Sequence, residues 1–166
     1  MDDLFEAGKK ITRDNTGNPG TDRWLIADAG NIAQMILRSS PQLYFNEKGK
    51  CMVDSPRFKE AFNWAKKFQD AGLAGGIGAW SNEWLVGFQD GSLAYEVIGA
   101  WMGGHLKNWV CPDTSGLWGV ANWPALKKGE PRMAGGWGGS FLAIPEVTKH
   151  KEEAWKVIEY ACTERE

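Results

Sequence analysis

Tryptophan beside glycine is the combination in this sequence that is best suited to binding chemistry. The 166 residues include 10 tryptophans and 21 glycines. Three short segments bring the two residue types together, at residues 78–84, 98–104 and 135–140. Glycine lets a ligand approach the backbone closely, and an indole offers a rigid flat face that loses little side-chain entropy. A sugar ring suits such a site, because it has C–H patches on its faces and hydroxyl groups around its rim.

The flanks of each tryptophan separate candidate ligand contacts from core residues. Trp101 and Trp137 have glycine-rich flanks that do not resemble a packed core, so we expect them to contact a ligand. Trp80 and Trp84 fit either a ligand contact or packing. The remaining tryptophans lie in amphipathic helices or apolar segments and are interpreted as packing residues: Trp24, Trp64, Trp109, Trp118, Trp123 and Trp155.

Catalytic chemistry has little support. A glycosidase needs two opposed carboxylates roughly 5 to 10 Å apart. Glu83, Glu96 and Asp28 are candidates, but the sequence does not fix their separation and surface carboxylates are common. A nucleophilic triad would depend on His105 or His150, and no G-x-S-x-G motif occurs. We therefore expect a binding protein and not an enzyme.

Cofactors, metals and nucleic acids are also disfavoured. Neither glycine-rich phosphate-binding motif is present, so no nucleotide cofactor is expected. A metal site built on His105 and Cys111 would lack ligands. Cys51, Cys111 and Cys162 have no C-x-x-C spacing and are expected to be free thiols, with Cys111 the most exposed. A net charge of -2 leaves no excess of basic residues to neutralise phosphates, which argues against nucleic acid as a partner.

The length and composition fit one domain that covers residues 1–166, with 43% hydrophobic and 24% charged residues. The longest apolar stretches, such as residues 25–29 and 141–145, are far shorter than the roughly 20 residues of a membrane-spanning helix. Residues 1–6 are acidic and do not read as a signal peptide.

Helical and extended patterns alternate along the chain. Apolar periodicity and caps predict helices over residues 2–12, 31–38, 56–71 and 81–88, a helix or tight turn from 99 to 109, and a final helix after Thr148. Short apolar runs predict strands at 23–27, 93–98, 117–121 and 140–144, and residues 44–45 and 51–53 flank a candidate hairpin turn. The predicted fold class is α/β, with a small mixed sheet flanked by helices.

A series of short motifs runs through nearly the whole chain, at residues 3–10, 53–58, 88–95, 99–101, 118–121, 135–140, 154–155 and 163–165. In this order they resemble the sugar-type extracellular solute-binding proteins of ABC importers, the maltose-binding group. In that family two α/β lobes close on a ligand about a hinge. The resemblance implies a periplasmic-binding-protein-like fold, a sugar or oligosaccharide ligand and an ABC-transporter permease as partner. It implies an extracellular or periplasmic location for the parent protein.

The resemblance also implies that this chain is the C-terminal-side lobe alone, without its N-terminal lobe. By position, Trp101 would stack on the sugar and the segment around Trp137 would form a neighbouring wall. The residues that would line the site share a location at element ends: Trp101, Trp137, Gly136 and Gly138 at the centre, Trp80, Asn82, Glu83 and Trp84 along the rim, and Asp28 and Asn31 as hydroxyl partners. Val97 and Ile98 depart from the small or polar residues that often stand there.

A second interpretation stays open. One lobe leaves the other face of a ligand in water and forfeits those contacts, so the chain could be an excised folding or interaction domain with no measurable ligand binding by itself. An exposed aromatic cleft could also cause self-association. The sequence does not specify which sugar binds.

Overall fold

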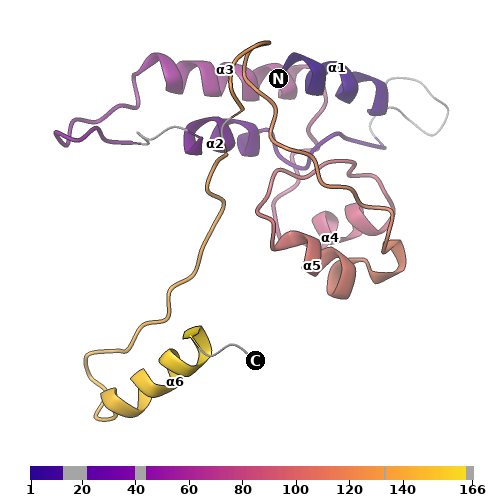
Figure 1. Ribbon diagram of the computed structural model, residues 1–166. Coiled ribbons are helices and arrows are strands. Elements are labelled where there is room, and N and C mark those ends of the chain that lie inside the picture. Colours follow the sequence, from indigo (N-terminus) through magenta and orange to yellow (C-terminus); the bar gives the residue numbers. More distant parts are fainter. Residues whose placement is uncertain (13–21, 40–43, 133, 164–166) are drawn as a thin grey trace.

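The computed structural model describes residues 1–12, 22–39, 44–132 and 134–163. Helices make up its regular structure (Figure 1), namely α1 (Asp2–Ile11), α2 (Gly30–Arg38), α3 (Pro56–Asp70), α4 (Asn82–Gln89), α5 (Met102–His105), the π-helical turn η1 (Leu106–Val110), the 3₁₀ turn η2 (Pro112–Thr114) and α6 (Lys151–Thr163). Helices α1, α2 and α3 lie together, α4 and α5 form a second group, and α6 stands apart at the end of a long arm.

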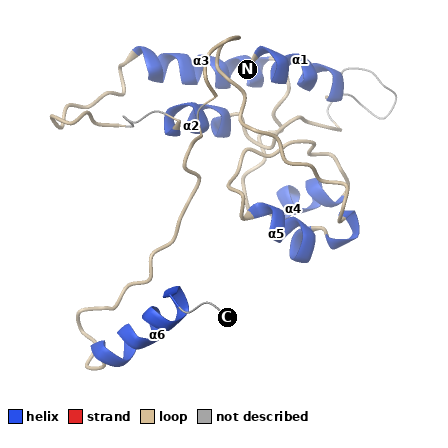
Figure 2. Ribbon diagram, in the orientation of Figure 1, coloured by secondary structure: helices blue, strands red, loops and turns tan. Residues whose placement is uncertain are grey.

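The predicted α/β fold with a small mixed sheet is wrong for this structure. No strand occurs among the described residues, as Figure 2 shows. Extended pairing within the described ranges is limited to isolated bridges, parallel between Trp24 and Leu93 and between Ile26 and Ala74, and antiparallel between Phe45 and Cys51. The described chain is helical with long irregular connections.

The physical reason lies in how few residues each extended segment pairs. Residues 24–27 are hydrogen-bonded on both sides: the Ile26 N–H donates to the Leu73 carbonyl at 3.1 Å, and the Tyr95 N–H donates to the Leu25 carbonyl at 2.8 Å. The chain then turns at Asp28 into α2, so the pairing stops before it becomes a ladder. The predicted hairpin is present as a single antiparallel bridge, closed by Asn46.

The other two predicted strands find no neighbour. Residues 118–121 and 140–144 make no backbone hydrogen bond with another described residue. Val120 is fully exposed and Phe141 is 97% exposed. A β-strand is stable only when a neighbouring strand pairs with its peptide groups, so an apolar run without a neighbour remains extended chain.

The first core lies between α1, α2 and α3. The sequence Ser55–Pro56 starts α3 as predicted, because the Ser55 hydroxyl caps the helix and proline fits its first turn. Phe58, Ala61, Ala65 and Phe68 point into the core at helical spacing, whereas Phe62 is exposed. Phe5 of α1 meets Phe68 edge to face with ring centroids 5.4 Å apart.

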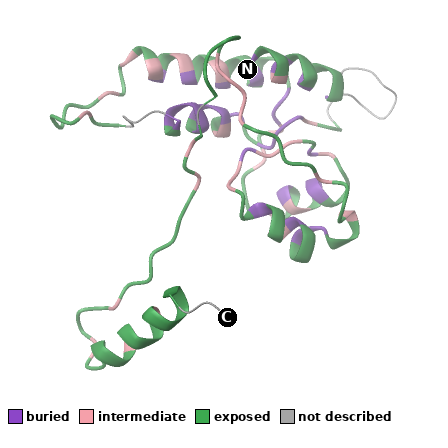
Figure 3. Cartoon of the chain, viewed as in Figure 1, coloured by how far each residue is buried: buried purple, intermediate pink, exposed green. Residues whose placement is uncertain are grey.

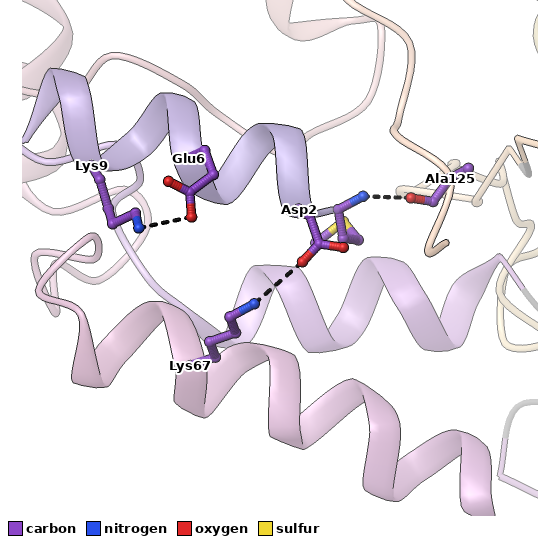
Figure 4. Close-up of polar contacts among 6 residues, drawn as sticks. Asp2, Glu6, Lys9, Lys67 and Ala125 are labelled. Carbon is purple, nitrogen blue, oxygen red and sulfur yellow. Dashed lines mark hydrogen bonds and ion pairs between the residues drawn. The ribbon is translucent and has the colours of Figure 1, made fainter. Parts of the chain in front are cut away.

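Polar contacts connect the helices that surround this core. Figure 4 shows Lys67 of α3 paired with Asp2 of α1 at 3.3 Å, and the Met1 backbone nitrogen donating to the Ala125 carbonyl. The Arg57 guanidinium donates twice to the Ile36 carbonyl, at 2.6 and 3.1 Å. Because the Ile36 carbonyl lies in the last turn of α2, Arg57 satisfies that helix end and joins it to α3.

The second core lies between α4, α5 and η1. Its buried members share contacts across these helices: Ala27, Trp84, Phe88, Leu93, Met102, Leu106, Val110 and Cys111. All three cysteines are free, but Cys111 is buried while Cys51 and Cys162 are exposed, so the predicted exposure of Cys111 is wrong. Cys111 follows Val110 into the core, and its neighbour Pro112 starts the 3₁₀ turn.

Helix α6 forms where it was predicted but has no buried residue, as Figure 3 shows. Trp155 is 53% exposed, so its assignment to the core is wrong, as is that of Trp109 at 64%. Trp64, Trp118 and Trp123 are partly buried against the cores, as expected. None of the helices in the described part of the chain has the length and apolarity needed to cross a membrane.

Candidate ligand-binding face

Four ring side chains form one continuous surface, which we call the aromatic face: Trp80, Trp101, His105 and Trp109. The indoles of Trp80 and Trp101 stack with an interplanar angle of 9° and ring centroids 5.9 Å apart. The His105 ring meets Trp101 edge-on at 5.2 Å and Trp109 at 5.7 Å. Trp80 and Trp101 remain 51% and 41% exposed, so the stack presents flat apolar surface to solvent.

Helical spacing explains three of the four positions. Trp101 is the N-cap of α5, His105 is its last residue and Trp109 lies in η1. Residues four apart share a face of a helix, so the i, i+4, i+8 series aligns these rings. The sequence therefore contains this helical period, although only Trp101 of the three residues was expected to contact a ligand.

Trp80 is placed by the start of α4. The Ser81 hydroxyl accepts a hydrogen bond from the Trp84 N–H at 3.1 Å and so caps the helix immediately after Trp80. Trp80 has φ 68°, the only positive φ of a described residue other than glycine. The left-handed region costs a non-glycine residue about 1 kcal/mol, and such strain persists where the surroundings hold the residue in place.

Trp101 is fixed by its polar edge. Its indole N–H donates to the Trp137 carbonyl at 3.3 Å. Gly99 permits this approach, because a Cβ there would lie 2.6 Å from the Trp101 Nε1 and 2.8 Å from the Trp137 oxygen. Gly138, with φ 93°, turns the chain beside the same ring. Two of the predicted tryptophan–glycine segments thus meet at one point.

The Trp137 ring itself faces the first core. It is partly buried there, and the Arg38 guanidinium lies over it at 5.0 Å from the ring centroid. Arg38 also donates to the Gly136 carbonyl at 3.4 Å. Trp137 therefore contributes its backbone carbonyl to the aromatic face, while its indole anchors residues 136–138 to α2.

Trp84 supports the aromatic face from below. Its side chain is fully buried, between the Trp80 ring at 5.0 Å and the Phe88 ring at 4.7 Å. Its indole N–H donates to the Glu96 Oε2 at 3.3 Å. The sequence left ligand contact and packing open for Trp84, and the structure places it in the packing position.

Glu96 connects this support to the two polar residues predicted near α2. The Asn31 side chain donates to the Glu96 Oε1 at 3.1 Å. Burial raises the pKa of Glu96 to about 7, with a smaller contribution from the charge of Asp28, against the lowering effect of the Trp84, Asn31 and Val97 hydrogen bonds. Asp28 is exposed and accepts from the Gly30 N–H, which starts α2.

Asn82 and Glu83 lie exposed in the first turn of α4, directly after Trp80 and Ser81. Hydrogen bonds from its own backbone N–H and from the Ser81 hydroxyl lower the pKa of Glu83. Its carboxylate is therefore an acceptor beside the aromatic face.

A pocket of about 360 Å³ opens beside Glu96. Its walls are mainly apolar and include Tyr95, Glu96, Ile98, Met102, Leu106 and Trp118. Burial and the Glu96 charge raise the pKa of Tyr95. No group of three or more His, Cys, Asp or Glu side chains that could hold a metal ion occurs among the described residues.

The structure thus brings together Trp80, Trp101 and the Trp137 carbonyl, with Trp84 beneath them. Asp28 and Asn31 lie at the Glu96 side of Trp84 and not on the aromatic face. The sequence interpretation missed His105 and Trp109 as members of this face and weighed Glu96 only as a catalytic carboxylate. An arrangement of stacked indoles edged by single polar acceptors binds rings with apolar faces and polar rims.

Comparison with known proteins identifies the family of this chain. The family described as bacterial extracellular solute-binding protein matches residues 1–166, and the chain belongs to that family. Among its relatives, the arabinooligosaccharide-binding protein of Bacillus subtilis (strain 168) is 29% identical over 164 residues. The lactose-binding protein of Rhizobium radiobacter is 27% identical over 154 residues. These alignments cover 96% and 92% of this chain, which spans 36% and 35% of the length of the two relatives.

Proposed function

We propose that this chain supplies part of the sugar-binding surface of an ABC-importer solute-binding protein and holds a sugar ring against the aromatic face. The observation that carries the proposal is the exposed, nearly parallel stack of Trp80 and Trp101. Family membership supports a binding role, and the two relatives are an arabinooligosaccharide-binding protein and a lactose-binding protein.

The chemistry of the face favours a neutral carbohydrate. The outer indole surface provides contact for the C–H groups of a pyranose or furanose, and the Glu83 carboxylate and the Asn82 amide at the start of α4 offer partners for hydroxyl groups. The aromatic face contains no lysine or arginine, and three of its four rings are uncharged indoles.

In the whole protein, a second lobe would close over the sugar and a permease would receive it. Those partners belong to the proposal, because the chain spans about a third of each relative. By itself the aromatic face leaves one side of a ligand in water, so we expect affinity in the millimolar range for this chain alone. The proposed location is extracellular or periplasmic.

The test is a tryptophan-fluorescence titration with arabino-oligosaccharides, lactose and a panel of other neutral sugars. Trp101→Ala is the test variant, and Trp155→Ala is the matched control, because Trp155 is similarly exposed but lies on α6. We expect a saturable change in the unmodified chain and in the control, and its loss in Trp101→Ala.

Circular dichroism must first show that each variant is folded. A folded chain that responds to no sugar would refute binding by the chain alone and favour the interpretation as an interaction domain. A response that survives in Trp101→Ala but is lost in Trp155→Ala would move the site to α6.

A further inference from the structure

We propose that Glu96 is a positioning residue that holds Trp84, and through it the Trp80–Trp101 stack, and that protonation of its carboxyl group couples the stack to pH. This inference deepens the proposed function, since it concerns the support of the same aromatic face. Glu96 accepts hydrogen bonds from the Trp84 indole and the Asn31 amide, so its effect on the aromatic face passes through Trp84.

Glu96 connects the two cores through its hydrogen bonds. One carboxyl oxygen accepts from the Trp84 indole at 3.3 Å and the other from the Asn31 amide at 3.1 Å. Trp84 belongs to the second core, and Asn31 lies in α2, which packs in the first. A single side chain therefore fixes the polar edge of Trp84 against a helix of the other core.

Trp84 in turn contacts the Trp80–Trp101 stack through the Trp80 ring. The Trp80 ring lies 5.0 Å from the Trp84 ring and 5.9 Å from the Trp101 ring, so its two flat neighbours determine its orientation. The backbone of Trp80 is in the left-handed region and does not prefer this conformation by itself. If Trp84 turns, Trp80 loses the contact that holds it parallel to Trp101.

The ionised and neutral forms of Glu96 differ in the hydrogen bonds that they make. The ionised carboxylate accepts from both partners, and hydrogen bonds to a charged acceptor are the stronger ones. The neutral acid carries a proton that needs an acceptor. The Asn31 amide can turn its oxygen toward that proton, whereas the Trp84 indole is only a donor. Ionisation therefore tightens the bond to Trp84, and protonation loosens it.

The Glu96 carboxyl group is accessible to protons from the pocket. Glu96 lines the 360 Å³ pocket, through which a proton can reach it without unfolding of the chain. Burial raises the pKa of Glu96 to about 7, so its carboxyl group changes charge near neutral pH. The other titratable groups that face it are Asp28, Tyr95 and, across the pocket, Lys107.

The experiment follows the exciton couplet of the stacked indoles by circular dichroism, without sugar, from about pH 5 to about pH 9. Trp101→Ala identifies the couplet by removing it. In the unmodified chain we expect the couplet to rise in one step centred near pH 7. Glu96→Gln should abolish the step, while Glu47→Gln, the same change at an exposed turn residue, should keep it.

His105→Asn is a second control, because the His105 ring contacts both stacked indoles. We expect the step to persist in His105→Asn. Loss of the step in His105→Asn together with its survival in Glu96→Gln would overturn the proposal, as would a couplet that does not change with pH in the unmodified chain.

Glu96→Leu tests the positioning role directly. We expect a weaker couplet at every pH and, for a sugar that binds the unmodified chain, an affinity lower by roughly tenfold. An unchanged couplet in Glu96→Leu would contradict the inference. If the variant does not fold, Glu96→Gln still decides it. Because the pH series contains no sugar, failure of sugar binding would refute the proposed function and leave the Glu96 result to be judged separately.

Discussion

At the scale of the residue, Gly99 determines how closely Trp101 approaches residues 137–138. A Cβ at this position would lie inside the contact distance of the Trp101 ring and of a backbone oxygen that cannot move alone. We predict that Gly99→Ala breaks the bond from Trp101 to the Trp137 carbonyl and lowers the free energy of unfolding by about 1 to 3 kcal/mol. Urea denaturation measures the loss.

Gly103→Ala is the matched control for this prediction. Gly103 lies in α5 and a Cβ there would meet nothing within 4 Å, so the change should be neutral or stabilise the chain by up to about 1 kcal/mol. Equal stability of the two variants would show that residues 99 and 137 are not in close contact.

Glu96 gives a second prediction at this scale, through the pH dependence of stability. Its pKa is about 7 in the folded chain against an ordinary 4.5, so the folded state keeps a proton that the unfolded state has lost. The free energy of unfolding should therefore fall as pH rises from about 4.5 to about 7, by about 3 kcal/mol in total. Denaturant titrations across this interval measure the slope.

The variant Glu96→Gln should flatten that slope, because glutamine does not titrate, whereas Glu47→Gln should leave it unchanged. If the unmodified chain instead gained stability over this interval, the carboxyl group would not be buried as described.

Single residues also show how far the sequence could be interpreted. The Trp101 ring is exposed, whereas the Trp137 ring, which has similar glycine-rich flanks, packs against the first core, so these flanks alone do not predict exposure. The cap at Ser81 starts α4 directly after Trp80. The burial of Trp84 and its bond to Glu96 could not be predicted, because Glu96 lies 12 residues away and the contact depends on how α4 packs on the chain after Leu93. Local patterns do not encode such tertiary distances.

At the scale of the element, the start of α4 links helix stability to the aromatic face. Ser81 accepts from the Trp84 N–H, which would otherwise be one of the unpaired donors of the first turn. We predict that Ser81→Ala destabilises the chain by about 1 kcal/mol and reduces the Trp80–Trp101 couplet, since Trp80 directly precedes the cap. Denaturation and circular dichroism measure the two effects.

The comparison variant is Ser55→Ala, which removes the cap of α3 far from the aromatic face, where the hydrogen bond is longer at 3.5 Å. It should cost stability but leave the couplet intact. A couplet reduced equally by both variants would mean that the stack reports global stability and not the cap of α4.

Elements differed in how well the sequence predicted them. Helices depend on local periodicity and caps, and every predicted helix from the first to the last is present in the structure. Strands depend on a neighbour, and the sequence at 117–121 and 140–144 carries the apolar pattern without specifying one. The predicted sheet was wrong for that reason, and so was the packing of α6, whose apolar side finds no surface among the described residues.

At the scale of the whole molecule, the arm that leads to α6 is largely exposed (Figures 1 and 3). Phe141 and Leu142 are exposed and make no backbone hydrogen bond with another described residue. We predict that chymotrypsin cleaves first after these residues and releases α6, because proteolysis favours exposed backbone. Mass spectrometry of a time course identifies the cut.

Phe68 and Phe88, which are buried in the two cores, serve as internal controls and should be cleaved only after unfolding. If cleavage at Phe141 were as slow as at Phe88, the arm would be packed and the exposed position of α6 would be incorrect.

An NMR titration of the tryptophan indole N–H signals tests whether a sugar binds against Trp80 and Trp101. The 10 tryptophans give separate reporters, which single substitutions assign. With a sugar identified by fluorescence, we predict saturable shifts of the Trp80 and Trp101 signals and no shift of the Trp155 signal. Saturable shifts confined to tryptophans outside the aromatic face, with Trp80 and Trp101 unmoved, would contradict it.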